Sequence, residues 1–413
     1  MSPASQTFKN FVALSGAQAV TMVTGLITTV ILARVLGPET YGVLGFGVAI
    51  ISYFMLVVNM GVDVHGMREI AYDQSRTAEI VGTILPLRFS LATMLFCLLY
   101  LLTITMNQPE RVRTVVLIQG FGLFATALTI DFVYQGFQRM GVIALRQCIA
   151  AIVGVSLVVV LVSAPSNLYE AAAIPVAVGI ATASGLLGFF LCRGGYLELS
   201  FDLSRWQRYL KQSAPIAFMV LMNTVLLNTD IVFIGFMREQ EEVGWYVAAA
   251  KVLTFALIAG NMLHNAFLPA LAKSHDGDKQ RLAYAHEHAS AVLFIGAPIC
   301  FVGIAFAAPI IDIIFGSAYA GAENALIILM LTAAASYLVT AHGTPLFAWK
   351  CDKPYALTLG IGGAINVVLN FILIPRYGIE GAAVATFICQ TCMWISLATV
   401  THRRFRFNHL KLI

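Results

Sequence analysis

Four charged residues stand inside long apolar stretches of the chain, where a charge needs a partner or a function. They are Arg88, Asp131, Asp230 and Lys251. A charge at the centre of a membrane-spanning helix costs about 2.5–3.5 kcal/mol on insertion scales. A guanidinium suits a diphosphate, which it can hold through two parallel hydrogen bonds. A Lys and an Asp among amides suit sugar hydroxyls, or a proton or Na⁺ that is bound and released.

Polar residues accompany three of these charges at helical spacing. Residues three, four or seven apart lie on one face of a helix, so the spacing predicts polar stripes. Two such stripes on neighbouring helices favour a water-filled cavity over a lipid-facing surface. We therefore predict that Arg88, Asp131, Asp230 and Lys251 contact the substrate, together with Asn223 and Asn261. The stripes are Lys251, Thr254, Asn261 and Asn265; Asn223 and Asp230; and, near the cytoplasmic mouth, Asp131, Gln135 and Gln138.

Structural roles are open for the same charges. Arg88 could pair with Asp63 or Asp131, which have a similar depth. Lys251 and Asp230 lie on consecutive antiparallel helices at nearly the same depth, so an ion pair between them is the main alternative to substrate contact. Asp131 could equally belong to a polar helix end at the headgroups.

No pattern in the sequence indicates catalysis or a cofactor. The Cys389–Cys392 spacing occurs in redox and zinc sites, but here it lies in an apolar segment, where both side chains act as small hydrophobic groups. His286 and His288 point to different faces of a helix, so we expect no metal site there. There is also no Gly-rich phosphate loop and no Ser-His-Asp set. We expect a protein that is not an enzyme.

The composition predicts the elements that must position these residues. The 413 residues are 59% hydrophobic and 11% charged, with a mean hydropathy of +0.84. Soluble domains carry about 45–50% apolar and about 25% charged residues, so this chain has too few polar groups for a water-facing surface. The net charge of +4 is too small to indicate a nucleic-acid partner. The remaining class is a protein that crosses the lipid bilayer several times.

Twelve stretches are long enough to cross a membrane as helices, because about 20 apolar residues span the hydrocarbon core. They lack the alternation of barrel strands. The fold class is therefore all-α, with twelve transmembrane helices in two six-helix bundles around a central cavity. The stretches are roughly 11–36, 41–61, 80–105, 114–136, 141–163, 168–191, 214–237, 243–268, 288–315, 323–349, 354–375 and 379–400.

The basic residues predict the orientation. Of the 25 Lys and Arg residues, 18 fall in the segments that lie inside if the N-terminus is cytoplasmic, and 4 fall in the outside loops. The positive-inside rule then puts both termini in the cytoplasm. The first apolar run continues into the rest of the protein without a cleavage site, so it is expected to be a permanent membrane span.

The predicted organisation has two bundles and a linker. Residues 1–191 form the first bundle and residues 214–413 the second, which ends in a short basic tail. The linker, 192–213, mixes aromatic and basic residues at helical spacing over 203–211, which is typical of an interfacial helix. A faint repeat relates residues 36–42 to 237–244, each joining the first two spans of a bundle. Two repeats around an axis along the membrane normal are a known transporter plan.

Short segments spread along the chain resemble the Wzx-type oligosaccharide flippases of the multidrug/oligosaccharidyl-lipid/polysaccharide exporter superfamily. Together they cover nearly the whole chain in the family's order, although the chain is short and lacks the extra C-terminal helix pair of lipid II flippases. The matching segments are Ala33-Arg-Val-Leu-Gly-Pro-Glu-Thr-Tyr-Gly-Val-Leu-Gly45, Asn59-Met-Gly-Val-Asp63, Arg68-Glu-Ile-Ala71, Asp131-Phe-Val-Tyr-Gln-Gly-Phe-Gln-Arg139, Asn228-Thr-Asp230, Glu242-Val-Gly-Trp-Tyr-Val-Ala-Ala-Ala-Lys251 and Tyr377-Gly-Ile-Glu-Gly-Ala-Ala-Val-Ala385.

The resemblance implies that a polyprenyl-diphosphate-linked oligosaccharide is moved from the cytoplasmic to the periplasmic leaflet for O-antigen, capsule or exopolysaccharide synthesis. The two bundles would rock around the cavity in alternating access. A polysaccharide polymerase is a candidate partner, and H⁺ or Na⁺ a candidate coupling ion. The alternatives are a cation-coupled multidrug exporter of the same superfamily and a lipid II flippase. Buried Arg and Lys argue against a cationic substrate. A membrane-embedded polymerase or ligase would need a large outside loop, which the sequence lacks.

Overall fold

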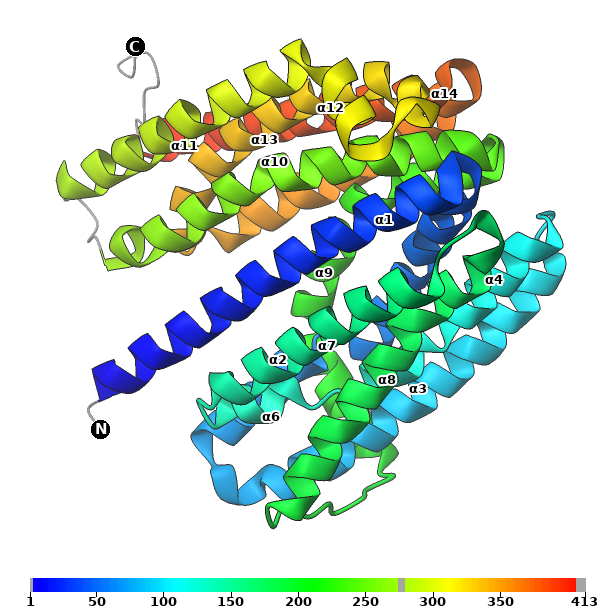
Figure 1. Cartoon of the computed structure of the whole chain (residues 1–413). Coiled ribbons are helices and arrows are strands. Elements are labelled where there is room, and N and C mark those ends of the chain that lie inside the picture. The colour runs from blue at the N-terminus through cyan, green and yellow to red at the C-terminus, as the bar shows by residue number, and fades with distance from the viewer. Residues whose placement is uncertain (1–2, 274–278, 406–413) are drawn as a thin grey trace. The chain divides into compact units, whose positions relative to one another are not determined.

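The computed structural model describes residues 3–273 and 279–405, which form helices joined by short loops, with no strand among them (Figure 1). The chain divides into two compact units, Met1–Leu221 and Met222–Ile413. The boundary falls inside one helix, α9 (Leu203–Met237), which belongs to both units. The residues expected to form the linker helix are the first turns of α9, and the loop before them contains no helix.

Unit 1 contains α1 to α8 and the first half of α9. Helix α1 packs along α7, and α8 packs against α4, α5 and α7. The shorter α4, α5 and α6 follow one another closely and together cover one span. The helices are α1 (Pro3–Asn59), α2 (Val62–Tyr72), η1 (Gln74–Arg76), α3 (Thr77–Thr105), α4 (Glu110–Gly120), α5 (Gly122–Leu128), α6 (Asp131–Gly136), α7 (Met140–Leu161), η2 (Pro165–Asn167) and α8 (Leu168–Cys192).

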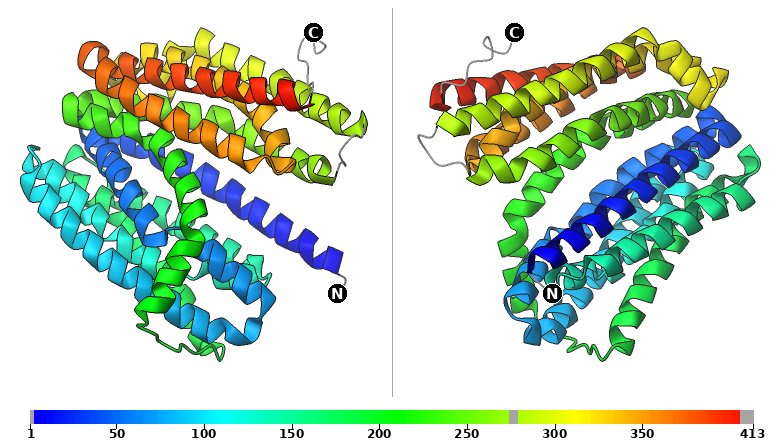
Figure 2. Two further views of the ribbon diagram at one scale, coloured as in Figure 1. Left: turned by 180° about the vertical axis from the view of Figure 1, so that it is seen from behind. Right: turned by 60° about the vertical axis from the view of Figure 1, so that its left-hand side comes forward.

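Unit 2 contains the second half of α9 and the helices that follow it. Helix α13 packs against α10, α11 and α14, and Figure 2 shows these long helices running side by side in both views. A buried core around Tyr337 joins α10, α11 and α13. The helices are α10 (Gln240–Lys273), α11 (Lys279–Ala305), α12 (Ala307–Phe315), η3 (Ser317–Ala322), α13 (Glu323–Ala348) and α14 (Asp352–Phe405).

Two glycines break the longest helices. Gly37 in α1 has φ 73° and Gly378 in α14 has φ 57°. A residue with a Cβ rarely adopts such angles, and the flanking Pro38 and Pro375 also weaken helix continuity. Each long helix is therefore two spans that meet at a sharp turn.

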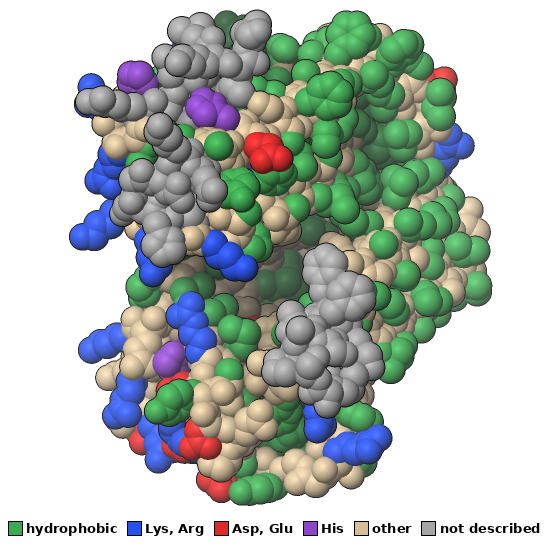
Figure 3. Space-filling model, turned by 90° about the vertical axis from the view of Figure 1, so that its left-hand side faces the viewer, with side chains coloured by type: hydrophobic (Ala, Val, Ile, Leu, Met, Phe, Trp, Pro, Cys, Tyr) green, Lys and Arg blue, Asp and Glu red, His purple; other side chains and the backbone are tan. Residues whose placement is uncertain are grey.

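The twelve predicted spans are confirmed. Ten helical stretches of the described chain are long and apolar enough to cross a membrane. Two of them, Val12–Tyr72 and Lys353–Phe405, hold the turns at Gly37 and Gly378 and supply two spans each. Lys and Arg side chains gather toward the left-hand edge of the face in Figure 3, and hydrophobic side chains cover most of its right-hand part. The molecule is a multi-pass membrane protein.

Candidate functional site

A buried carboxylate with four polar partners lies in unit 2. Asp230, on α9, is 4% exposed. Its Oδ2 accepts hydrogen bonds from the Tyr246 hydroxyl at 2.5 Å and from the Thr386 hydroxyl at 2.6 Å. Its Oδ1 accepts from the Asn370 amide at 2.5 Å and the Asn366 amide at 3.2 Å. Burying a carboxylate is costly unless hydrogen bonds compensate it, and this site supplies four.

The turn at Gly378 makes this cluster possible. Asn366 and Asn370 are one helical turn apart before the turn, and Thr386 comes after it. Because the chain reverses at Gly378, Thr386 returns to within 3.4 Å of the Asn366 amide nitrogen. The Asn370 Oδ1 atom is buried without a hydrogen-bond partner among the described residues. The cluster therefore holds an unused oxygen acceptor beside a carboxylate.

Lys251 does not join the Asp230 cluster. Its side chain is exposed, and within residues 3–273 and 279–405 it forms no ion pair with Asp230. The expected alternative of a Lys251–Asp230 ion pair is therefore not what this structure contains. The other members of its stripe, Thr254, Asn261 and Asn265, are also exposed.

The Lys251 stripe lies on the side of α10 away from its core. Leu253, Leu257 and Phe267 of the same helix pack into the core with α11 and α13. Asn223 of α9 is exposed, whereas Asp230, two turns later, is buried. The structure thus separates the predicted residues of unit 2 into an exposed set, Asn223, Lys251 and Asn261, and one buried carboxylate.

Arg88 is enclosed in unit 1. It is 0% exposed and forms an ion pair with Asp63. It also donates to the Asn59 Oδ1 atom at 2.8 Å and to the Thr129 carbonyl at 3.0 Å. Asn59 in turn donates to Asp63 at 3.0 Å. Of the two pairings expected from the sequence, the structure contains the one with Asp63, and substrate contact by Arg88 stays a prediction.

Asp131 is paired elsewhere. Its two carboxylate oxygens accept from the Arg146 guanidinium at 2.9 and 2.5 Å, a fork that fixes both side chains. Arg146 also lines an open pocket of about 470 Å³ between α1, α7 and α8. The pocket carries four threonines and two glutamines, a lining rich in the groups that hydrogen-bond to sugars. These residues are Gln18, Thr21, Thr24, Thr28, Gln147 and Thr182.

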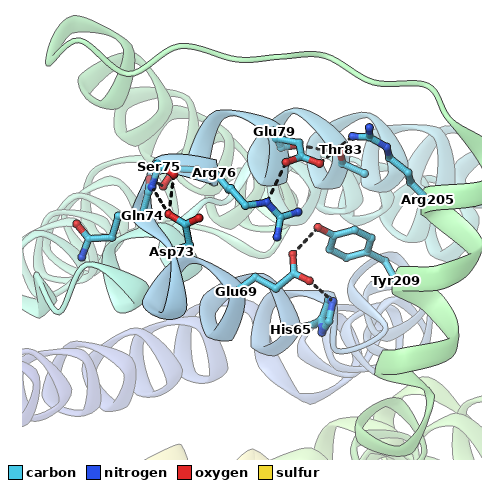
Figure 4. A network of polar contacts seen from close by, with 11 residues as sticks. His65, Glu69, Asp73, Gln74, Ser75, Arg76, Glu79, Thr83, Arg205 and Tyr209 are labelled. Atoms are coloured by element: carbon cyan, nitrogen blue, oxygen red, sulfur yellow. Dashed lines mark hydrogen bonds and ion pairs between the residues drawn. The ribbon is translucent and has the colours of Figure 1, made fainter.

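A polar network joins α2, α3 and the start of α9 at one end of unit 1 (Figure 4). The Tyr209 hydroxyl donates to Glu69 at 2.9 Å, and Arg205 donates to Glu79 at 3.0 Å. Hydrogen bonds from Ser75 lower the pKa of Asp73 beside this network. Those from Ser204 similarly lower the pKa of Asp202. The network fixes the first turns of α9 to unit 1.

Residues 7–275 match the family model described as "Polysaccharide biosynthesis protein", which covers more than half of the chain. The chain belongs to this family. This polysaccharide biosynthesis protein is 21% identical over 398 residues to a protein of Escherichia coli K12 named as a candidate O-antigen transporter, covering 94% of this chain and 95% of that one. It is 20% identical over 399 residues to a Staphylococcus aureus capsular polysaccharide biosynthesis protein, covering 94% and 97%.

Solved structures share the fold. The lipid II flippase MurJ in an inward closed conformation has a TM-score of 0.78 at 13% identity and covers 94% of this chain and 87% of that one. An inward-facing multidrug transporter of the MATE family has a TM-score of 0.71 at 14% identity, covering 97% and 99%. The chain therefore shares its fold with these two solved structures.

Several residues of these polar sites are not among those predicted from the sequence. Asn366 and Asn370 carried a signal, since two amides four residues apart interrupt an apolar span. Thr386 and the threonines of the α1–α7–α8 pocket carried none, because threonine is common in membrane helices. Their hydroxyls also satisfy themselves locally, as Thr21 does by donating to the Ala17 carbonyl.

Proposed function

We propose that the protein moves a polyprenyl-diphosphate-linked oligosaccharide from the cytoplasmic to the periplasmic leaflet by alternating access, for O-antigen, capsule or exopolysaccharide synthesis. The family membership supports this class, and so do the relatives named for O-antigen transport and capsule synthesis, which match along almost their whole length. Binding can drive such a cycle only if the substrate's contacts differ between the two states. The transported unit would then be consumed by a polymerising enzyme on the far side.

The exposed stripe of α10 carries the proposal. An exposed Lys destabilises a membrane helix unless water surrounds the side chain or an anionic ligand binds it. Lys251 is exposed without an acidic partner in the described chain, and Asn261 and Asn265 are exposed on the same stripe about 15 and 21 Å further along α10. A cation followed by amides along one stripe matches a phosphate joined to a chain of sugars. The pocket lined by Gln18 and Thr21 offers further hydroxyl and amide contacts to sugars.

The arrangement disfavours export of cationic drugs. Such a transporter would need a carboxylate that a drug-sized cation can reach, but Asp131 is paired with Arg146 and Asp230 is buried. The available charge on the exposed stripe is instead positive. Lipid II remains a related substrate class, supported by the shared fold alone.

A flippase-deficient strain tests the proposal. Expression of the wild-type protein should restore surface polysaccharide and clear the lipid-linked oligosaccharide that accumulates in the cell. Lys251→Ala should fail at equal membrane levels, whereas Lys211→Ala, which removes an exposed Lys from the start of α9, should succeed. Rescue of a strain depleted of its lipid II flippase, without rescue of polysaccharide display, would contradict the proposed substrate.

The Asp230 cluster is our candidate for the coupling-ion site. A hard monovalent cation such as Na⁺ prefers carboxylate, amide and hydroxyl oxygens, and rotation of the two amides would present Asn366 and Asn370 oxygens beside Asp230 and Thr386. A proton on Asp230 would satisfy the same position. Retention of radioactive Na⁺ by the purified protein, lost in Asp230→Asn, would support Na⁺. Absence of retention together with proton uptake that is lost in the same variant would favour H⁺.

The orientation also belongs to this proposal. Both termini are expected in the cytoplasm of a bacterium, with the protein in its inner membrane. Cysteines introduced at residues 164–166 and 317–320 should react with an impermeant reagent added from the periplasm. A cysteine at Gln207 should not react. Labelling of that position from the periplasm would reverse the topology.

A further inference from the structure

A second basic site lies on unit 1, apart from every residue assigned above to transport. An open pocket of about 460 Å³ is formed by η1, α6, the start of α7 and the end of α8. Arg139, just before α7, and Arg193, just after α8, both line it. Both are exposed, and neither forms an ion pair within residues 3–273 and 279–405. None of the residues that line the pocket is acidic.

One of the two arginines is stacked on an aromatic ring. The Arg193 guanidinium lies over the Phe189 ring, 5.1 Å from its centroid. Tyr134, which is buried, lies in the wall near both arginines. An arginine stacked on a ring keeps its fork of donors free for an anion. Because the positive-inside rule places this end of unit 1 in the cytoplasm, the anion would be at the level of the inner headgroups.

A groove continues from this pocket into membrane depth, apolar except for Arg146 and Thr182, which also line the α1–α7–α8 pocket. A cavity of about 630 Å³ runs between α7 and α8, and Val142 and Phe189 line both it and the arginine pocket. On α7 the groove extends from Val142 to Leu157, about 22 Å at 1.5 Å per residue. On α8 its wall is made by small residues such as Ala181 and Gly185.

We propose that this combined site docks a single-chain isoprenoid lipid through its diphosphate, with the chain lying in the α7–α8 groove. The inference rests on the proposed function, because such a lipid is the carrier of that substrate. Two guanidinium forks match two phosphoryl groups, and one groove between two helices matches one chain rather than two. The site would collect the carrier from the cytoplasmic leaflet before the transport cycle begins.

The chain offers matched variants for a test. A Cβ on Gly185 or on Gly188 meets nothing within 4 Å, so both positions accept the first carbon of a side chain without a clash. Only Gly185 lines the groove. The double change Arg139→Gln with Arg193→Gln removes two charges from the pocket. Arg208→Gln with Lys211→Gln removes two exposed charges outside it, on the first turns of α9.

Native mass spectrometry of the full-length protein, titrated with undecaprenyl diphosphate, measures the binding. The pocket double variant and Gly185→Leu should each weaken it about tenfold, while Gly188→Leu and the control double variant stay within about twofold. Equal weakening by the control variants would overturn the proposal. So would a wild-type site that binds phosphatidylglycerol as tightly, because that result would indicate an ordinary phospholipid site.

The outcomes separate this proposal from the transport function. Lys251 does not line the pocket or the groove, so Lys251→Ala should bind undecaprenyl diphosphate at this site while losing display. If the pocket double variant binds normally and Lys251→Ala still loses display, the docking site is contradicted and the flippase function is supported. If the pocket double variant and Gly185→Leu weaken binding as expected but the wild-type protein never restores display, the docking site is supported and the flippase function is contradicted.

Discussion

Arg88 and Lys251 are both cations inside membrane helices, one in each unit, and the protein surrounds them in opposite ways. Arg88 is closed off by an ion pair with Asp63 and by oxygens of Asn59 and Thr129. Lys251 is exposed on a stripe with amides and has no acidic partner among the described residues. A charge that is paired internally stabilises a bundle, whereas one left exposed is available to a ligand. Charge inside a span therefore does not by itself identify a transport residue.

The largest effect should come from removing Arg88. Arg88→Ala leaves Asp63 without its counter-charge, and breaking such a buried pair costs about 3 kcal/mol. The purified protein should denature at a lower temperature, and less of it should reach the membrane. Arg205→Ala, which breaks a half-exposed pair with Glu79, should cost less than about 1 kcal/mol.

Arg88→Lys sharpens this assignment. A single ammonium cannot reproduce a fork that reaches Asp63, Asn59 and the Thr129 carbonyl together, so we expect only partial recovery of stability. An Arg88→Ala protein with wild-type thermal stability but no polysaccharide display would make Arg88 a substrate contact and would erase the contrast with Lys251.

Lys251→Ala should reverse the pattern by affecting transport and sparing stability. Display should fall about tenfold or more, the effect of losing one charge-assisted contact of about 1.4 kcal/mol, while the denaturation temperature stays unchanged. The double change Lys251→Ala with Asp230→Ala should not restore display, because the two side chains are not paired. Recovery in the double variant would indicate that they pair during the cycle.

A smaller effect is expected at the edge of the Asp230 cluster. Thr386→Val removes one hydrogen bond to the buried carboxylate and should lower stability by about 1 kcal/mol. Thr391→Val, on the same helix, removes only a bond to its own backbone and should be nearly neutral. Thermal denaturation of the two variants side by side measures the difference. Equal values would mean that Thr386 contributes nothing to Asp230.

The exposed amides should give the smallest change. Asn261→Ala and Asn223→Ala each remove one neutral hydrogen-bonding group, and we expect display to fall by about twofold without loss of protein. Display measured at graded expression levels resolves an effect of this size. A loss as large as that of Lys251→Ala would move the centre of the site from the cation to the amides.

The sequence is sufficient to predict the spans and the charged residues within them, but not which side chains those charged residues contact. Hydropathy predicts twelve spans, because membrane helices depend mainly on local composition. The choice between Asp63 and Asp131 as partner of Arg88 depends on helix rotation, which one sequence does not specify. The Asp230 cluster was equally out of reach, since Thr386 lies 156 residues from Asp230 in the chain. Exposure was the other missing quantity, and it separates Lys251 from Arg88.

The continuity of α9 has a consequence for insertions and deletions. Within unit 2, Leu226 packs against Leu359 and Met393, and one turn later on the same helix Asp230 must face Tyr246 and Asn370. Each added residue turns everything after it by about 100°. One residue inserted between Leu226 and Thr229 would put the carboxylate out of phase with the helix that positions it, while the non-helical residues 194–200 could absorb the same insertion. Length variation among homologues should therefore be found before Leu203 and be absent from the turn of α9 that leads to Asp230.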